Sequence, residues 1–120
     1  MSSSQWQNVI EQAWDTRAKL SPGQHSSELR LTINQILRGL EIGELRVAEP
    51  TDSGWQVNAW LKQAILLHFR ITNNQVMTDG MSQFFDKVAL RFHSEDDPAE
   101  TGARIVPPAV VRTGAYIGSD

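Results

Sequence analysis

The sequence predicts an α+β protein: a small helical domain with a few short strands, followed by the start of a parallel β-helix. Apolar residues recur at helical spacing in three segments, and apolar and polar residues alternate in short runs between and after them. In the last segment, aliphatic residues recur every six positions, which fits neither an α-helix nor a plain strand.

The first predicted helix starts near Ser4, with a serine cap in front. We expect it to end before Pro22 and Gly23, because neither residue favours helix continuation. Apolar residues lie at steps of three and four, which places them on one face. They are Trp6, Val9, Ile10, Ala13, Trp14 and Ala18.

The second predicted helix starts after Ser26 or Ser27, with Glu28 in the first turn, where a carboxylate is favourable. Gly43 is expected to end it in a left-handed cap. We expect the two helices to pack as an antiparallel pair. The buried stripe of the second helix is Leu29, Ile33, Ile36, Leu37 and Leu40.

A hairpin is predicted next, because Leu45 and Val47 alternate with polar or small residues, residues 50–54 form a turn, and Trp55 and Val57 resume the alternation. Asn58 is the expected cap of a third helix that runs to about Arg70. Apolar residues cover most of its circumference, so we expect it to be the hydrophobic centre of the domain. They are Trp60, Leu61, Ala64, Ile65, Leu66, Leu67 and Phe69.

Beyond this helix, turns are predicted at residues 72–74 and 79–80, and residues 75–77 form a run too short to assign. Alternation then predicts a strand, preceded by Phe84 and Phe85. In it Val88, Leu90 and Phe92 alternate with Ala89 and Arg91. We expect the strands of the domain to form a small mixed set.

Residues 94–102 are acidic and rich in helix breakers, which predicts a mobile linker. We place the domain boundary after it, giving an N-terminal α+β domain at 1–103 and the β-helix start at 104–120. In this second part Ile105, Val111 and Ile117 are six residues apart, so each would place one side chain inside a β-helix coil.

The stretch Arg-Ile-Val-Pro-Pro-Ala-Val-Val-Arg-Thr-Gly-Ala-Tyr-Ile at 104–117 resembles the start of the left-handed β-helix of tetrahydrodipicolinate N-succinyltransferases. The resemblance continues, in order, over Leu45-Arg-Val-Ala-Glu, Trp60-Leu-Lys-Gln-Ala-Ile-Leu-Leu-His-Phe-Arg-Ile, Asn74-Gln-Val and Phe85-Asp-Lys-Val. It implies a succinyltransferase of lysine and diaminopimelate biosynthesis, homotrimeric in its complete form, with succinyl-CoA as co-substrate. Family members continue with further β-helix coils, so residues 104–120 are expected to form only the first turn.

The resemblance also implies that Arg104 contacts the dicarboxylate substrate. A guanidinium suits that role because its planar fork matches a carboxylate in two hydrogen bonds. Pro107 and Pro108 stiffen the backbone just after it. Arg112 is a weaker candidate, because in a β-helix it would point outward and meet a neighbouring subunit.

Acyl transfer to an amine needs a base and donors for the developing oxyanion. In the family these groups and the coenzyme groove lie on later coils, so we assign no catalytic, cofactor-binding or metal residue here. We therefore expect the 120-residue chain alone to be inactive. Without stacked coils, residues after about Pro107 are expected to be disordered, swapped or paired with another copy.

The remaining candidates have plainer interpretations. Asp86, beside Lys87, is expected to be a cap or surface pair, and Glu95, Asp96 and Asp97 a solvated loop without calcium-ligand spacing. His25, His68 and His93 share no metal-site spacing, and His68 is expected to be hydrogen-bonded in a core or interface. The four tryptophans are expected to be core anchors.

Composition narrows the function class. The chain of 120 residues carries a net charge of −3, shows no basic cluster and has no cysteine, which argues against nucleic-acid binding, disulfides and thiolate chemistry. The N-terminus does not resemble a secretory signal and no apolar run has bilayer length, so we expect a cytoplasmic protein without membrane partners.

Two alternatives remain open. One is a stand-alone module that binds a dicarboxylate or another protein without catalysis, which would not need the missing coils. The other is a different hexapeptide-repeat acyltransferase with a related N-terminal domain. Binding of 2-aminopimelate distinguishes a retained substrate site from a purely scaffolding domain.

Overall fold

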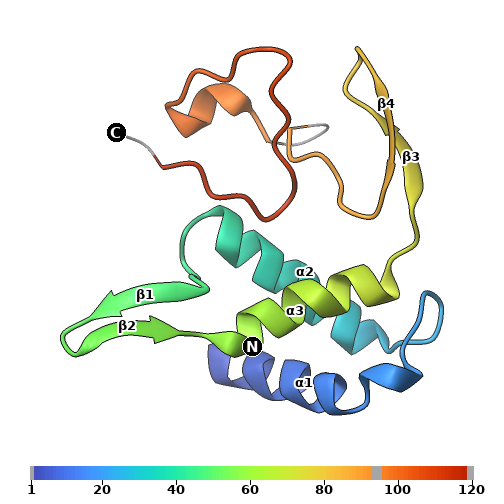
Figure 1. The fold of residues 1–120 in the computed structure, drawn as a ribbon, viewed down its shortest axis with the longest axis vertical. Coiled ribbons are helices and arrows are strands. Elements are labelled where there is room, and N and C mark those ends of the chain that lie inside the picture. The colour runs from blue at the N-terminus through green and yellow to red at the C-terminus, as the bar shows by residue number, and fades with distance from the viewer. Residues whose placement is uncertain (1, 93–95, 119–120) are drawn as a thin grey trace.

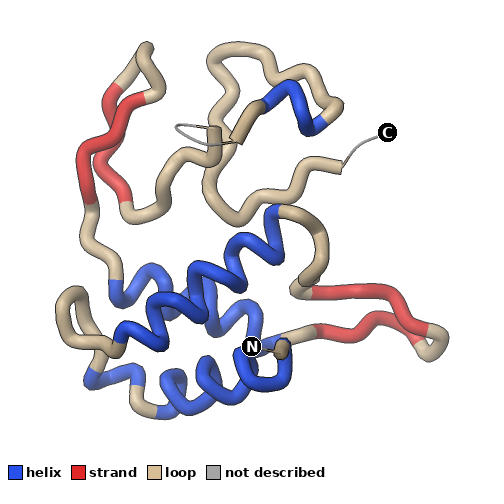
Figure 2. Tube along the Cα trace, turned by 180° about the vertical axis from the view of Figure 1, so that it is seen from behind, coloured by secondary structure: helices blue, strands red, loops and turns tan. Residues whose placement is uncertain are grey.

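The computed structural model describes residues 2–92 and 96–118. Figure 1 shows three helices packed together, with the chain after residue 71 forming a separate layer beside them. Seen from behind in Figure 2, two hairpins extend from opposite sides of this assembly. Within the described residues no helix is long and apolar enough to span a membrane.

Helix α1 (Ser3–Asp15) begins where predicted because a capping box fixes its first turn. The Ser2 hydroxyl accepts from the Gln5 backbone N–H at 3.3 Å, and the Gln5 side chain accepts from the Ser2 backbone N–H at 2.7 Å. This satisfies two backbone donors that have no partner within the helix.

The predicted apolar face of α1 is confirmed up to Trp14. Ile10 is fully buried, and the others pack partly buried against the core: Trp6, Val9, Ala13 and Trp14. Ala18 lies instead in a short 3₁₀ helix, η1 (Arg17–Lys19), and is exposed.

Helix α2 (Ser27–Glu41) is capped by Ser26, whose hydroxyl accepts from the Leu29 N–H at 3.1 Å. All five residues of the predicted stripe are buried. Gly43 follows the helix with φ +79°, which confirms the left-handed stop. Figure 1 shows α2 running back along α1, so the antiparallel pairing is also confirmed.

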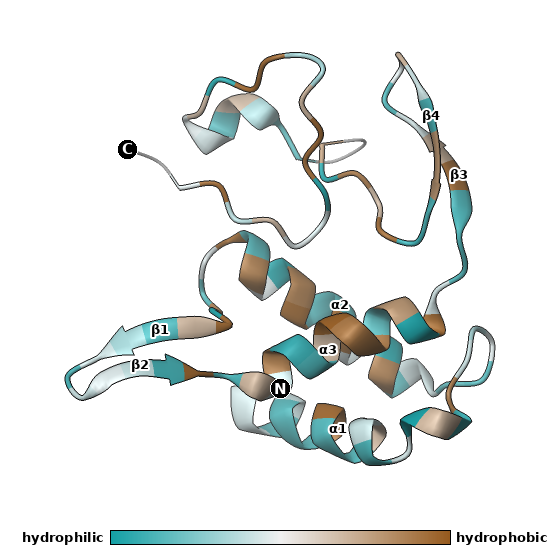
Figure 3. Cartoon of the chain, viewed as in Figure 1, coloured by the Kyte–Doolittle hydropathy of each residue, from teal (hydrophilic) through white to brown (hydrophobic). Residues whose placement is uncertain are grey.

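Helix α3 (Ala59–Ile71) packs against both α1 and α2. It contributes four buried residues to the shared core: Leu61, Ala64, Leu67 and Ile71. Figure 3 shows the hydrophobic patches of α2 and α3 lying next to each other. The core is therefore a three-helix core.

Asn58 is the N-cap residue of α3, but its side chain makes no capping hydrogen bond, so that part of the prediction is wrong. Its amide nitrogen donates to the Arg46 carbonyl at 2.7 Å and to Glu49 Oε1 at 3.1 Å. Asn58 thus ties α3 to the preceding hairpin.

The first hairpin consists of β1 (Ala48–Thr51) and β2 (Gly54–Val57), antiparallel, with Pro50 opposite Trp55. The hairpin prediction is confirmed, but the burial prediction is not. Trp55 is 74% exposed, so it is not a core anchor, because the hairpin extends away from the helices.

The second hairpin consists of β3 (Gln75–Thr78) and β4 (Gln83–Asp86), also antiparallel. The predicted strand at residues 88–92 is wrong: only an isolated bridge, between Leu90 and Arg112, forms there. The alternating apolar residues of this stretch reflect the burial of Val88 and not pairing with a neighbouring strand. Both described sheets are antiparallel, so the prediction of a mixed set is also wrong.

The acidic stretch is more structured than predicted where it is described. Asp97 caps a 3₁₀ helix, η2 (Pro98–Thr101), by accepting from the Ala99 N–H at 2.9 Å. Asp96 forms ion pairs, so it is not merely solvated. Glu95, of the same predicted loop, lies outside the described residues.

Candidate functional site

The C-terminal segment, defined here as residues 104–117, lies over the C-terminal end of α2 (Figure 1). The Arg91 N–H donates to the Val111 carbonyl and the Thr113 N–H donates to the Ala89 carbonyl, each at 2.9 Å. We expected residues after about Pro107 to be disordered, swapped or paired with another copy, and here they pair with their own chain instead.

The residues spaced by six share one property. The side chains of Ile105, Val111 and Ile117 are mostly covered by the protein. The neighbouring Val106 and Tyr116 are more exposed, at 51% and 48%. Ile105 and Val111 line the same cavity. Their side chains therefore point to the inner side of the segment, although the β-helix assignment itself stays a prediction.

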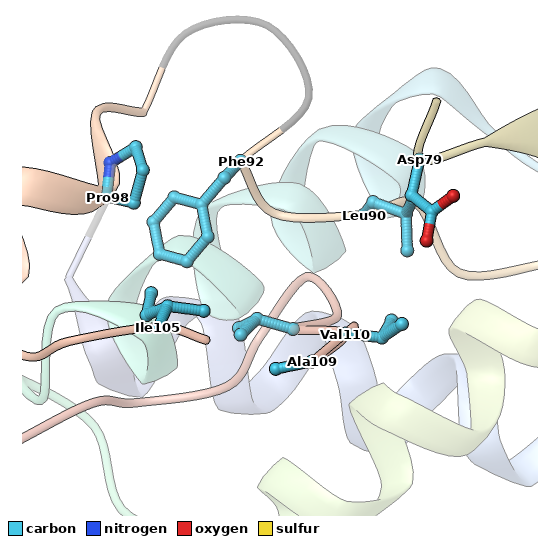
Figure 4. A pocket seen from close by; sticks show the side chains of 8 residues that line it. Asp79, Leu90, Phe92, Pro98, Ile105, Ala109 and Val110 are labelled. Carbon is cyan, nitrogen blue, oxygen red and sulfur yellow. The ribbon is translucent and has the colours of Figure 1, made fainter. Parts of the chain in front are cut away.

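Figure 4 shows this cavity, whose volume is about 240 Å³. Its lining residues are Leu90, Phe92, Pro98, Ile105, Ala109, Val110, Val111 and Asp79. Asp79 is the one titratable residue in this lining. Hydrogen bonds from the Met81 and Ser82 backbone N–H groups hold the pKa of Asp79 below its ordinary value, so this carboxylate is already stabilised by its own turn.

Arg104, the predicted substrate contact, is exposed and follows Gly102, which ends η2 in the left-handed conformation. It lies next to Ile105 but does not line the cavity that Ile105 enters. Within residues 2–92 and 96–118 its guanidinium has no hydrogen bond, ion pair or aromatic partner. This side chain is therefore available to an external anion.

Every other arginine of the described residues contacts a partner within the protein, which makes the contrast with Arg104 informative. Arg112 donates to Asp86 at 2.6 Å, so the surface pair predicted for Asp86 exists but with Arg112 rather than Lys87. Backbone hydrogen bonding from Lys87, with a further contribution from Arg112, lowers the pKa of Asp86. The expected contact of Arg112 with a neighbouring subunit stays a prediction, since the Arg112 side chain is 51% exposed beside this pair.

A network of four charged side chains lies at the end of α2, and the sequence interpretation missed it. Arg38 donates to Glu41 at 2.9 Å and to Asp96 at 3.0 Å, and Arg91 contacts Asp96 at 3.5 Å. A cavity of about 440 Å³ opens beside these residues. The signal that would have found the network is Glu41 itself, since it follows Leu37 by four positions and continues the apolar stripe.

His68 is hydrogen-bonded, as predicted: its Nδ1 lies 3.0 Å from Arg30 Nη1. Within the described residues no group of three His, Asp or Glu side chains is placed to hold a metal ion. His25 is half-buried and contacts the Ser26 carbonyl at 3.2 Å, and His93 lies outside the described residues.

A family model and several curated relatives that match this chain are all named for an N-succinyltransferase. A family model described as "Tetrahydrodipicolinate N-succinyltransferase N-terminal" matches residues 5–71. Three relatives are each named 2,3,4,5-tetrahydropyridine-2,6-dicarboxylate N-succinyltransferase. The one from Polynucleobacter asymbioticus is 47% identical over 118 residues, covering 95% of this chain and 43% of the relative.

The relative from Methylococcus capsulatus is 47% identical over 92% of this chain and 42% of its own length. The relative from Ralstonia nicotianae is 46% identical over 98% of this chain and 44% of its own length. The chain therefore spans about two fifths of the length of these curated relatives.

Proposed function

Because the chain belongs to the tetrahydrodipicolinate N-succinyltransferase family, we propose that it is the N-terminal part of an enzyme that transfers succinyl from succinyl-CoA to tetrahydrodipicolinate. The observation that carries this proposal is the sequence identity of 46–47%, over 92–98% of the chain, to relatives with that name. The reaction belongs to lysine and diaminopimelate biosynthesis, and succinyl-CoA is the co-substrate of the complete enzyme.

Arg104 is the proposed substrate contact, binding a carboxylate of the dicarboxylate substrate through its guanidinium fork. Two features support this role. Arg104 is exposed, and among the arginines of the described residues it alone has no hydrogen-bonding, ionic or aromatic partner. By contrast, Arg30, Arg38 and Arg112 each bind a side chain of the same protein.

We also propose that residues 104–120 begin a left-handed β-helix and that the complete enzyme is a homotrimer with active sites between subunits. The inward placement of Ile105, Val111 and Ile117 supports the first part. The exposure of Val76 and Phe85 on the second hairpin, 69% and 70%, is compatible with the second part. Sedimentation of the complete enzyme as a monomer would refute the trimer.

The 120-residue chain alone should not turn over succinyl-CoA. Amine acylation needs a base within hydrogen-bonding reach of the acceptor amine. The carboxylates that contact the C-terminal segment, Glu41 and Asp86, accept hydrogen bonds from protein donors. So does Asp79, which lines the cavity beside Ile105. Release of coenzyme A from succinyl-CoA by purified residues 1–120 would contradict this.

Calorimetric titration with 2-aminopimelate, a linear amino dicarboxylate, tests the substrate contact. We expect measurable binding that Arg104→Ala abolishes and Arg104→Lys weakens, since lysine keeps the charge but loses the fork. Arg17→Ala is the matched control, because Arg17 is an exposed arginine stacked on Trp14 in the helical unit. Equal binding by wild type and Arg104→Ala would remove Arg104 from the site.

A further inference from the structure

Glu41 occupies a position that is electrostatically unfavourable. It is the last residue of α2, at the negative end of the helix dipole, and only 6% of its surface is exposed. A carboxylate buried at that end destabilises the fold unless donors compensate it.

The compensation comes from two directions. Glu41 Oε1 accepts from the Gly114 backbone N–H at 2.9 Å, and Glu41 Oε2 accepts from Arg38 Nη1 at 2.9 Å. Hydrogen bonds to an ionised acceptor are stronger than neutral ones. The first of them joins residues that are 73 positions apart, so it links α2 to the C-terminal segment.

We propose that Glu41 is a positioning residue that fixes the C-terminal segment, and with it Arg104, on the three-helix core. The role of Arg104 in this statement rests on the proposed function. The anchoring of the segment by Glu41 does not.

Glu41 stands out because the other hydrogen bonds of the segment lead elsewhere. The bonds of Val111 and Thr113 join it to residues 89–91, which belong to the same outer layer rather than to a helix. Within the described residues, the bond from Gly114 to Glu41 is the one hydrogen bond between the C-terminal segment and the helices. The ion pair between Arg38 and Asp96 also connects α2 to the outer layer. It contributes less, because the Arg38 side chain is 53% exposed to solvent.

The anchor reaches Arg104 through the packing of the segment. Ile105 and Val111 line the cavity shown in Figure 4, against Leu90 and Phe92. Seating Ile105 in this cavity fixes where the adjacent Arg104 emerges. Release of Gly114 would loosen the segment that holds both residues.

Glu41→Leu tests the anchor. Leucine fills a similar volume, and it leaves no unpaired buried charge behind, because Arg38 is 53% exposed and still pairs with Asp96. We expect amide exchange at Gly114 to accelerate by roughly tenfold or more, since one charge-assisted hydrogen bond is lost. Exchange at Leu37 and Leu67, inside the helices, should stay unchanged.

Two further variants make the result specific. Glu41→Gln keeps a carbonyl that accepts from Gly114, so it should restore most of the protection. Glu44→Leu is the matched control, because Glu44 is exposed three residues later and should leave Gly114 unaffected. Unchanged exchange at Gly114 in Glu41→Leu would overturn the proposal, as would acceleration that the helix amides share equally.

Ligand binding decides the second half of the proposal. If wild type binds 2-aminopimelate, Glu41→Leu should weaken binding in proportion to the loss of chains with the segment docked, and Glu44→Leu should not. Unaltered affinity in Glu41→Leu with Gly114 released would overturn the positioning of Arg104. Absence of binding in wild type would refute the proposed substrate contact, while amide exchange would still decide whether Glu41 is the anchor.

Discussion

Arg30 on α2 donates from Nη1 to Nδ1 of His68 on α3 over 3.0 Å. Its Nη2 donates to the Ile71 carbonyl at 3.0 Å and to the Thr72 hydroxyl at 2.9 Å, where α3 ends. Because arginine offers no acceptor, Nδ1 of His68 must accept, so the ring is neutral with its proton on Nε2. One guanidinium thus caps α3 and fixes the tautomer of His68.

This contact predicts loss of stability on acidification. Burial, followed by the charge of Arg30, lowers the pKa of His68 below its ordinary value of 6.5. Above 6.5 the ring is neutral in both folded and unfolded chains. Below 6.5 the unfolded chain takes up the proton first, so the free energy of unfolding falls as the pH decreases toward the folded-state pKa.

Urea unfolding at about pH 7.5 and about pH 5.5, on either side of the ordinary histidine pKa, measures this. His68→Gln should reduce the difference between the two pH values, since glutamine accepts from Arg30 without titrating. His25→Gln is the control and should keep the difference. If His68→Gln keeps the full difference in unfolding free energy between the two pH values, groups other than His68 cause that difference.

Two adjacent leucines on α3 test the three-helix core. Leu67 is fully buried and Leu66 is 41% exposed. Leu67→Ala should reduce the free energy of unfolding by about 3 kcal/mol, through lost burial and the cavity left behind. Leu66→Ala should cost under about 1 kcal/mol. Similar losses in urea unfolding would mean that α3 is not packed as described.

The helices could be predicted from the sequence because their signals are local. The spacing of Leu29, Ile33 and Ile36 reports a buried face whatever it packs against. Caps such as Ser26 act within one turn. The strands were harder, because alternation reports burial of one face, whereas a strand also needs a neighbouring backbone.

Trp55 and Val88 illustrate the two errors. Trp55 lies in a strand, as predicted, but no other part of the described chain covers its side chain. Val88 is buried, but it does not belong to a strand. The bond from Gly114 to Glu41 was beyond prediction for another reason. A periodic pattern shows that Glu41 faces inward but not which residue, 73 positions away, it meets.

Neighbouring serines test the start of α2. Ser26→Ala removes the hydroxyl that accepts from the Leu29 N–H at 3.1 Å, so it should cost about 1 kcal/mol of unfolding free energy. Ser27→Ala changes the first residue inside the helix, where alanine is the better helix former, and should cost almost nothing. Thermal unfolding that ranks Ser27→Ala as the more damaging change would place the cap one residue later.

Two glycines with nearly the same backbone conformation separate strain from crowding. Gly43 has φ +79° and Gly23 has φ +81°, so alanine at either position should cost about 1 kcal/mol in backbone strain. A Cβ atom at Gly43 would lie 2.8 Å from Cε2 of Tyr116, whereas one at Gly23 would meet nothing within 4 Å. Gly43→Ala must therefore also displace the Tyr116 ring from under Arg46, whose guanidinium lies 4.8 Å from the ring centroid.

Urea unfolding should accordingly show a larger loss for Gly43→Ala than for Gly23→Ala, by roughly 1 kcal/mol or more, the usual cost of overpacking. Introducing Gly43→Ala into a Tyr116→Ala background removes the clash, so its cost there should fall to that of Gly23→Ala. This cycle reports the docking of the C-terminal segment without altering Glu41. If Gly43→Ala costs the same in both backgrounds, Tyr116 does not rest on the end of α2.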